Sequence, residues 1–92
     1  MESKTTYTFN TEKNLWLKQV RHISFEQVIE AIEQGGLLDV RPHPDQKRYA
    51  HQEMYVVEIR RYAYIVPFIQ EENAIFLKTI YPSRKANKKY LK

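Results

Sequence analysis

The chain contains no cysteine, so it can form neither a disulfide framework nor a thiolate nucleophile. Its three histidines alone cannot supply a Cys/His zinc site. The apolar runs are far too short to cross a bilayer, and the first ten residues, MESKTTYTFN, lack the apolar segment of a signal peptide. We therefore expect a cytoplasmic protein that uses no metal or other cofactor and does not associate with membranes.

Acidic side chains are missing from the last fifteen residues, KTIYPSRKANKKYLK. This segment carries six cations, whereas residues 1–77 carry nine basic and eleven acidic side chains. The excess positive charge behind the net charge of +4 therefore belongs to one terminal segment. Such an asymmetry indicates a polyanion or an acidic protein as the partner.

The remaining composition is that of a globular protein. Hydrophobic residues make up 42% of the 92 residues, and the aromatic set comprises seven Tyr, four Phe and one Trp. This length is enough for one small domain with one core but not for two. With no internal repeat or linker in sight, we predict a single domain over residues 1–92.

The stretch ISFEQVIEAIEQGG has the strongest helix signals. Ser24 stands at an N-cap position with Gln27 three residues later, which is the spacing of a capping box. From Phe25 onward, apolar residues recur at helical spacing, and Gly35-Gly36 supplies a left-handed stop. The sequence therefore predicts a helix that begins after Ser24 and ends at the glycines.

The flanking segments predict the rest of an α+β fold. Tyr7–Phe9 suits a short strand, and residues 11–21 suit a helix whose apolar side holds Leu15, Trp16 and Val20. Period-two patterns predict strands at residues 37–40, 54–59, 62–69 and 74–81, and Ser83 can cap a final helix through Lys92. We expect the short strand and two helices to pack on one face of an antiparallel meander of three to four strands, with a short C-terminal helix.

Two predicted strand features carry specific expectations. The link at Arg60-Arg61 is short enough for a hairpin, although arginine is a poor residue for the positive φ angles of two-residue turns. Pro67 lacks an N–H, so its strand should have a bulge or a free edge there. Glu71-Glu72 falls in a hairpin loop, and we interpret this pair as solvated.

Two segments together resemble a known family. The first, FNTEKNLWLKQVRHISFEQV, and the C-terminal end match its pattern at Phe9, Lys13, Asn14, Arg21, His22, Ile23, Ser24 and Phe25 and at Lys78, Ile80, Ser83, Arg84, Ala86 and Tyr90. In these positions the chain resembles the BrnT group of bacterial type II toxins, whose fold is RelE/ParE-like. It departs from that pattern in lacking the glycine after His22, in having Asn10 in place of a tryptophan, and in its lysine-rich final helix.

The resemblance implies a metal-independent endoribonuclease that cleaves mRNA, either free or on the ribosome, and inhibits translation. It also implies a cognate antitoxin as protein partner, with DNA bound only through the antitoxin complex. Attack of a ribose 2′-hydroxyl on the adjacent phosphate requires a base, a cation and an acid. The catalytic candidates are Lys78 and Arg84 for the phosphate, with His22 and Tyr90 for proton transfer. RNA-binding candidates are Arg60, Arg61, Lys85, Lys88 and Lys89.

Each catalytic candidate also has a structural interpretation. Alternation places Leu77 with Ile75 and Thr79 on one face and Lys78 with Phe76 and Ile80 on the other, so Lys78 either contacts RNA from an open face or lies along an exposed sheet. Arg84 is either a phosphate ligand or a surface arginine at a helix start. His22 either transfers a proton or bonds near the helix cap, and Tyr90 either meets RNA or packs the last helix on the sheet.

Other residues and functions stay open at this level. His43 and His51 suit plain surface positions, and the strand aromatics Tyr55, Tyr62, Tyr64 and Phe68 suit sheet packing better than base stacking. Two rival functions compete with the nuclease: a nucleic-acid binder that does not cut, for example in a repressor complex, and an inactive module that binds only protein. Phosphate-binding cations look alike in cutters and binders.

Overall fold

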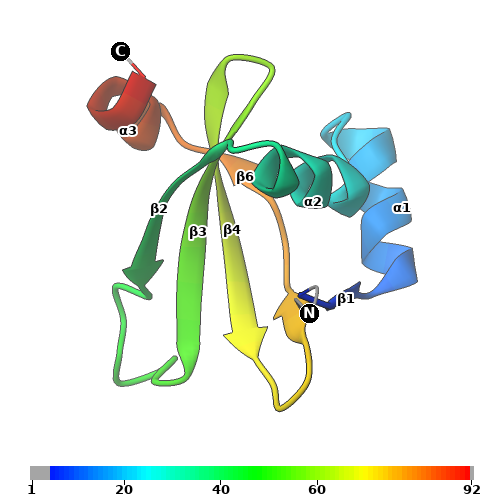
Figure 1. Cartoon of the computed structure of the whole chain (residues 1–92), viewed down its shortest axis with the longest axis vertical. Coiled ribbons are helices and arrows are strands. Elements are labelled where there is room, and N and C mark those ends of the chain that lie inside the picture. The colour runs from blue at the N-terminus through cyan, green and yellow to red at the C-terminus, as the bar shows by residue number, and fades with distance from the viewer. Residues whose placement is uncertain (1–4, 92) are drawn as a thin grey trace, which may run out of the picture.

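The computed structural model describes residues 5–91 and contains one mixed six-stranded sheet with helices packed on it (Figure 1). The strand order is β1-β5-β4-β3-β2, and β6 pairs with β4 beside β5. The elements are β1 (Tyr7–Phe9), α1 (Thr11–Val20), α2 (Phe25–Glu33), β2 (Leu37–Pro42), β3 (Gln52–Ile59), β4 (Tyr62–Gln70), β5 (Ile75–Leu77), β6 (Tyr81–Pro82), α3 (Arg84–Ala86) and a π-helical turn η1 (Asn87–Leu91). The predicted α+β class is confirmed. The sheet is not purely antiparallel, because β1 pairs parallel to β5.

The predicted start of α2 is present in full. The backbone N–H of Gln27 donates to the Ser24 hydroxyl at 3.2 Å, and the Ser24 N–H donates to the Gln27 side chain at 2.9 Å. At the other end, Gly35 has a φ of +92°, a backbone conformation that residues with a side chain rarely adopt. Gly36 serves a different purpose: a Cβ there would lie 3.0 Å from the Ala31 and Glu58 carbonyl oxygens. The two glycines therefore end the helix and bring it close to β3.

Helix α1 buries a different side from the one predicted. Leu17 is completely buried and Asn14 nearly so, whereas Leu15 and Val20 are 53% and 54% exposed and Trp16 is 40% exposed. The reason is the packing of the helix on α2: the Asn14 side-chain oxygen accepts the Phe25 N–H at 2.8 Å, and its amide donates to Glu26 at 2.9 Å. These bonds turn the Asn14–Leu17 side inward and the tryptophan side outward.

Each face of the sheet has its own apolar cluster. The first face packs against α1 and α2, and its cluster comprises Leu17, Ile23, Phe25, Val28, Tyr55, Val57, Ile59, Val66, Phe68, Leu77 and Ile80. The second face packs against α3 and η1 through the smaller cluster Val56, Ala63, Ile65 and Ala86. Successive residues of β3 and β4 alternate between these clusters, as side chains of a strand must.

The strand predicted over residues 74–81 is interrupted. β5 ends at Leu77, β6 begins at Tyr81, and between them the Lys78 N–H donates to the Pro67 carbonyl at 2.8 Å. The N–H and C=O of a strand residue point to the same side, so the donor that Pro67 lacks would face this same segment. β4 itself has no bulge at Pro67, because its register with β3 is regular; on the other side of β4 the ladder with β5 ends at Leu77, so only this edge is free of regular pairing.

The interruption also reverses the alternation of side chains. Phe68 pairs with Leu77, so a regular ladder would pair Ile65 with Ile80; its observed partner is Tyr81. A shift of one residue exchanges the two faces. Ile80 therefore joins Leu77 in the first cluster, and its predicted place on the open face beside Lys78 is wrong.

The C-terminal segment is helical as predicted but changes geometry. The Ser83 hydroxyl accepts the Ala86 N–H at 3.1 Å and so caps α3, after which the chain continues as the wider turn of η1. This segment covers part of the face that the sequence predicted to be open. Lys92, which the prediction included in the helix and among its surface cations, lies outside the described residues.

Candidate nucleic-acid interface

The β3–β4 hairpin presents two arginines at its tip. Arg60 and Arg61 form the two-residue turn, with φ of 52° and 67°. These are the positive φ values that such turns require and that residues with a Cβ adopt at a cost of about 1 kcal/mol or more each. Both side chains are exposed. The sequence argument against this turn correctly identified an unfavourable residue type, but the hairpin forms nevertheless.

The hairpin tip contacts the turn between α1 and α2. A guanidinium nitrogen of Arg60 donates to the His22 carbonyl at 2.8 Å. His22 itself has φ 57° and an exposed side chain. The contact places His22 beside the cationic hairpin although 38 residues separate His22 and Arg60 in sequence.

Arg21 links the same turn to the chain before β6. Its guanidinium donates to the Ile80 carbonyl, and its central carbon lies 4.9 Å from the centre of the Trp16 ring. On the same helix, the Lys13 ammonium lies 4.4 Å from that ring centre. Arg21 therefore stands between the exposed tryptophan and the end of the sheet.

Arg84 reaches this end of the sheet from the second face. The Ser83 N–H donates to the Ala63 carbonyl at 3.0 Å, and the Ala63 N–H donates to the Asn87 side chain at 3.0 Å. Because Ala63 comes two residues after Arg61, these bonds hold the start of α3 next to the hairpin. We call Arg21, Arg60, Arg61 and Arg84 the arginine end of the sheet.

The arginine end has no acidic partner among residues 5–91. The ion pair in that range joins Lys18 to Glu26 at 3.9 Å and involves none of the four arginines. All four side chains are exposed, and two of them donate to backbone carbonyls. Arginine forks with free donors are suited to bind phosphate oxygens in pairs.

The other cationic candidates are spread further along the second half of the chain. Lys78 is exposed, and its backbone pairs with Pro67. Pro67 is about 13 Å along the extended strand from Ala63, which contacts the start of α3 at the arginine end. Lys85, Lys88 and Lys89 are exposed on α3 and η1. A nucleic-acid strand of a few nucleotides is long enough to reach Lys78 and the arginine end together, whereas a single phosphate is not.

Tyr90 is held away from His22. It packs against the cluster on the second face, and its hydroxyl donates a short hydrogen bond to the Asp39 carboxylate of β2. This bond lowers the pKa of Asp39 and raises the pKa of Tyr90. His22 adjoins the cluster on the first face, so the structure does not bring the two predicted proton-transfer groups together. The packing interpretation of Tyr90 accounts for its contacts.

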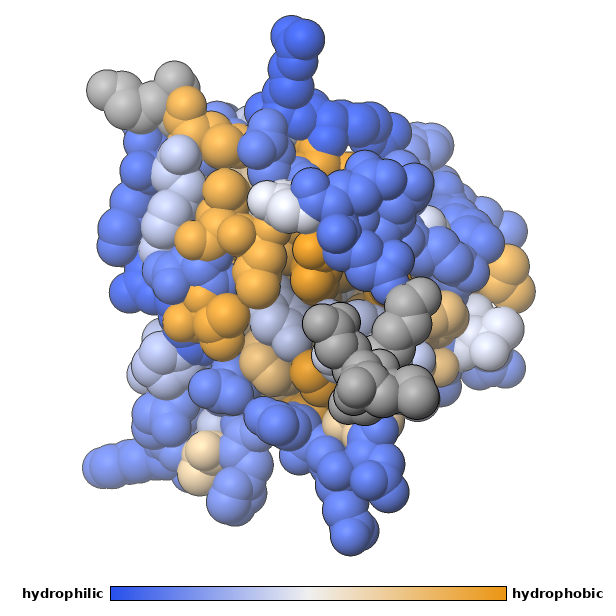
Figure 2. Space-filling model, in the orientation of Figure 1, coloured by the Kyte–Doolittle hydropathy of each residue, from blue (hydrophilic) through white to orange (hydrophobic). Residues whose placement is uncertain are grey.

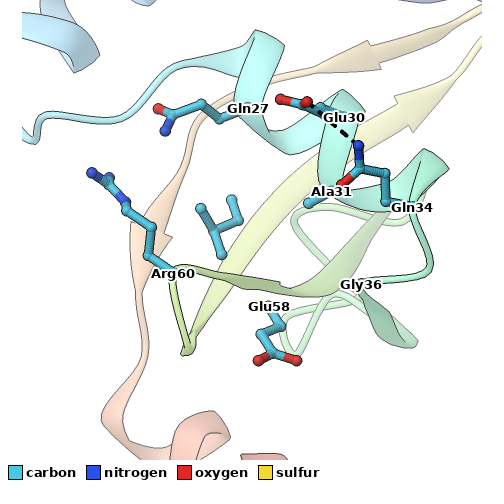
Figure 3. Close-up of a pocket in the computed structure, with 8 residues that line it drawn as sticks. Gln27, Glu30, Ala31, Gln34, Gly36, Glu58 and Arg60 are labelled. Carbon is cyan, nitrogen blue, oxygen red and sulfur yellow. Dashed lines mark hydrogen bonds between the residues drawn. The ribbon is translucent and has the colours of Figure 1, made fainter.

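A hollow of about 360 Å³ lies between α2 and the end of β3 (Figure 3). Gln27, Glu30 and Gln34 line it from the helix, with Arg60 at one side. In Figure 3 the Glu58 carboxylate points away from α2, and Glu30 accepts a long hydrogen bond from Gln34 at 3.5 Å. The acidic side of this hollow is unsuited to a phosphate, so the exposed arginine end is the better candidate site.

The strand aromatics lie mainly in the core, as the packing interpretation predicts. Tyr55 and Phe68 stack with ring centres 4.0 Å apart in the first cluster, and burial raises the pKa of Tyr55 to about 12. Exposed apolar surface lies elsewhere: Figure 2 shows hydrophobic side chains beside β2, where Leu37 and Val40 are exposed. Trp16 is the large exposed aromatic ring nearest to Arg21.

Across residues 5–91, no group of three or more His, Cys, Asp or Glu side chains is arranged to hold a metal ion. No helix in that range is long and apolar enough to cross a membrane.

No family model, curated protein or solved structure matches this chain. The resemblance to BrnT-like toxins therefore stays a prediction made from the residues themselves.

Sequence reasoning missed two residues that the structure makes prominent. Arg21 appeared only as part of a family-like pattern, and its position at the arginine end depends on contacts with Ile80, 59 residues away. Asp39 gave no signal at all, yet its two oxygens accept the Val40 N–H at 2.8 Å and the Tyr90 hydroxyl. The distances in sequence explain why neither role is visible in the pattern of residues.

Proposed function

We propose that this protein is the toxin of a bacterial type II toxin–antitoxin pair, a metal-independent endoribonuclease that cleaves mRNA and inhibits translation. The observation that carries the proposal is the arginine end: four exposed arginines, without acidic partners among residues 5–91, that come from three separate segments at one end of the sheet. An RNA strand is the polyanion that such a surface suits, because arginine binds phosphate oxygens through paired hydrogen bonds.

The arrangement supports a division of labour in cleavage. The 2′-oxygen attacks phosphorus, its proton passes to a base, and the 5′-oxygen leaves with a proton, giving a cyclic 2′,3′-phosphate and a free 5′-hydroxyl. Arg60 and Arg84 would stabilise the developing charge, and His22 is the exposed group suited to proton transfer near neutral pH. Lys78 would hold the strand further along. Tyr90 would act by fixing α3 and η1 to β2.

The same surface suits an antitoxin. A protein partner with an acidic segment would cover the arginine end and the lysines of α3 and η1, and would compete with RNA for them. We propose this competition as the means of neutralisation, with DNA reached only through the partner.

A second candidate function is RNA or DNA binding without cleavage. It is favoured by the separation of Tyr90 from His22, because a cutter needs an acid as well as a base within reach of one phosphate. The binding surface would be the same, and only turnover would differ.

The test combines cleavage with binding. A labelled single-stranded RNA is incubated with the protein in the presence of a chelator, and products and affinity are measured for wild type, His22→Ala, Arg84→Ala and Lys78→Ala. Arg48→Ala is the matched control, since Arg48 is exposed in the loop before β3, at the strand end opposite the hairpin. We expect cleavage by wild type and the control, loss of cleavage in His22→Ala, and weaker, less salt-dependent binding in Arg84→Ala, with the log–log salt slope lower by about 0.7.

Each alternative predicts its own result. Salt-dependent binding with no products in any variant would favour the non-cutting binder. Binding that Arg84→Ala and Arg48→Ala weaken equally would remove the arginine end as the site. If induced expression leaves growth and cellular mRNA intact in wild type, the toxin proposal fails.

A further inference from the structure

We propose that Trp16 is a stacking platform for a base of single-stranded RNA, and that it extends the arginine end onto α1. The inference rests on the proposed function and deepens it, because it adds a base contact to the cations that the arginine end offers to phosphates. Trp16 is the single tryptophan of the chain.

The first support is that the core does not account for Trp16. A tryptophan in a small domain is highly buried on average and usually packs in the apolar core. Here the ring is 40% exposed and belongs to neither apolar cluster, while the neighbouring Leu17 is completely buried. The contacts of Asn14 with α2 fix this orientation of α1, so the exposed ring belongs to the folded state.

The second support is the charge around the ring. The Lys13 ammonium and the Arg21 guanidinium lie 4.4 Å and 4.9 Å from the ring centre. Because these cations lie over the ring, a base would stack on Trp16 by displacing one of them, and the displaced cation would then be next to the phosphate of that nucleotide. Arginine planes also stack with bases in their own right.

The third support is continuity with the arginine end. Arg21 contacts the Trp16 ring and also donates to the Ile80 carbonyl, directly before β6. From there, Ser83 and Arg84 follow on the same side of β4, and Arg60 reaches His22 next to Arg21 in sequence. A strand bound by the four arginines therefore passes within one side chain of Trp16.

An acidic protein helix is the competing occupant, because Leu15 and Val20 add apolar surface to the same helix. The cations favour a nucleotide, since two of them lie over the aromatic ring, where the phosphate of a stacked nucleotide would also be. The occupant is decided by which side chain binding depends on: stacking requires the ring of Trp16, whereas a protein helix would require Leu15 and Val20 as well.

The experiment uses the fluorescence of Trp16 in the full chain. Three probes are titrated: a short single-stranded RNA, the same ribose-phosphate backbone without bases, and inorganic polyphosphate. We expect the RNA to quench Trp16 and the two base-free probes to bind through the arginines with little quenching. The variants lack this fluorophore, so their affinities are measured with labelled RNA and by calorimetry with polyphosphate: Trp16→Leu should weaken RNA binding by about 5- to 150-fold and leave polyphosphate binding unchanged, while Trp16→Phe should retain most of the affinity.

Leu15→Ala is the matched control on the same helix, and we expect it to bind RNA as wild type does. Equal RNA affinity in Trp16→Leu and wild type would overturn the platform, and so would equal quenching by the base-free backbone. In either case the proposed function stands if binding still depends on Arg84. Absence of any RNA binding would overturn both. A protein partner would be indicated if an acidic helical peptide displaces RNA and if Leu15→Ala weakens binding of that peptide more than Trp16→Leu does.

Discussion

Helices α1 and α2 cover one face of the sheet and the segment α3–η1 covers part of the other, but the two layers are held by different contacts. The helix layer supplies Leu17, Phe25 and Val28, all fully buried, to a large apolar cluster. The C-terminal layer supplies one buried residue, Ala86, and no residue of η1 is buried. Polar bonds from Asn87 and Tyr90 add to this smaller apolar contact.

This contrast indicates a division between stability and function. Apolar burial dominates folding free energy, whereas a hydrogen bond contributes a small net amount. The helix layer should therefore determine whether the chain folds. The C-terminal layer, which carries Arg84 and three of the lysines, should be adjustable without unfolding the sheet.

The largest expected effect tests the helix layer. Leu17→Ala removes a fully buried side chain from the first cluster, and we expect a loss of about 2–5 kcal/mol of unfolding free energy. Leu15→Ala, on the exposed side of the same helix, should change it by less than about 0.5 kcal/mol. Denaturant unfolding measures both. Similar losses in the two variants would show that α1 does not present this side to the sheet.

A smaller loss is expected when the contact between the two helices is cut. Asn14→Ala leaves the Phe25 N–H without its acceptor and removes the donor to Glu26, and we expect a loss of about 1–3 kcal/mol. Asn73→Ala, in the exposed loop before β5, is the control with no expected loss. The bond from Asn14 also lowers the pKa of Glu26, so a rise of that pKa in Asn14→Ala, followed by NMR, checks the contact itself. An unchanged Glu26 titration would contradict the proposed geometry.

The helix layer was also the more predictable part from sequence. The capping box of Ser24 and Gln27, the apolar spacing after Phe25 and the stop at Gly35 are all local signals, and the structure contains each of them. The orientation of α1 was predicted wrongly, because three apolar residues suggested one buried side. A polar residue, Asn14, takes the buried position instead, since α2 offers it both a donor and an acceptor.

The arginine end could be predicted only in part. Arg60, Arg61 and Arg84 stood out as cations next to turns, but their proximity depends on pairings that no local pattern contains. The predicted alternation of side chains failed after Leu77, because the neighbouring strand has Pro67, which offers no N–H to a regular ladder. The pairing register then shifts by one residue, and Ile80 lies in the core. Local propensities predict elements, whereas a site assembled from distant segments requires their register.

At the tip of the β3–β4 hairpin, one substitution should raise the unfolding free energy and lower the RNA affinity. Arg61→Gly relieves a positive φ of 67°, and we expect a gain of up to about 1 kcal/mol in unfolding free energy. The same change removes one cation from the arginine end and should weaken RNA binding. Arg61→Lys keeps both the charge and the strain, so its stability should stay at that of wild type. A hairpin that loses stability with glycine would show that the Arg61 side chain makes a contact important to the fold.

The smallest effect concerns the polar attachment of the C-terminal layer. The Tyr90 hydroxyl and then the Val40 N–H lower the pKa of Asp39 below its ordinary 3.8, so the charged carboxylate stabilises the attachment above that pH and the contribution is lost as pH falls through the folded pKa. The pKa of Tyr90 is raised above 10.0, mainly by Asp39, so its contribution is present below pH 10.0 and is lost as pH rises through the folded value. The attachment should therefore be tightest between about pH 4 and 10.

Tyr90→Phe isolates this attachment, because it removes the hydroxyl and keeps the ring that packs on the second cluster. We expect the pKa of Asp39 to rise only part of the way to 3.8, since the Val40 N–H still donates to it, and the η1 amides to exchange faster with solvent. Tyr81→Phe is the control: burial alone raises the pKa of that tyrosine, and Asp39 should titrate as in wild type. Faster exchange confined to α3 and η1 would mean that the two layers separate independently; faster exchange in α1 and α2 as well would mean that they do not.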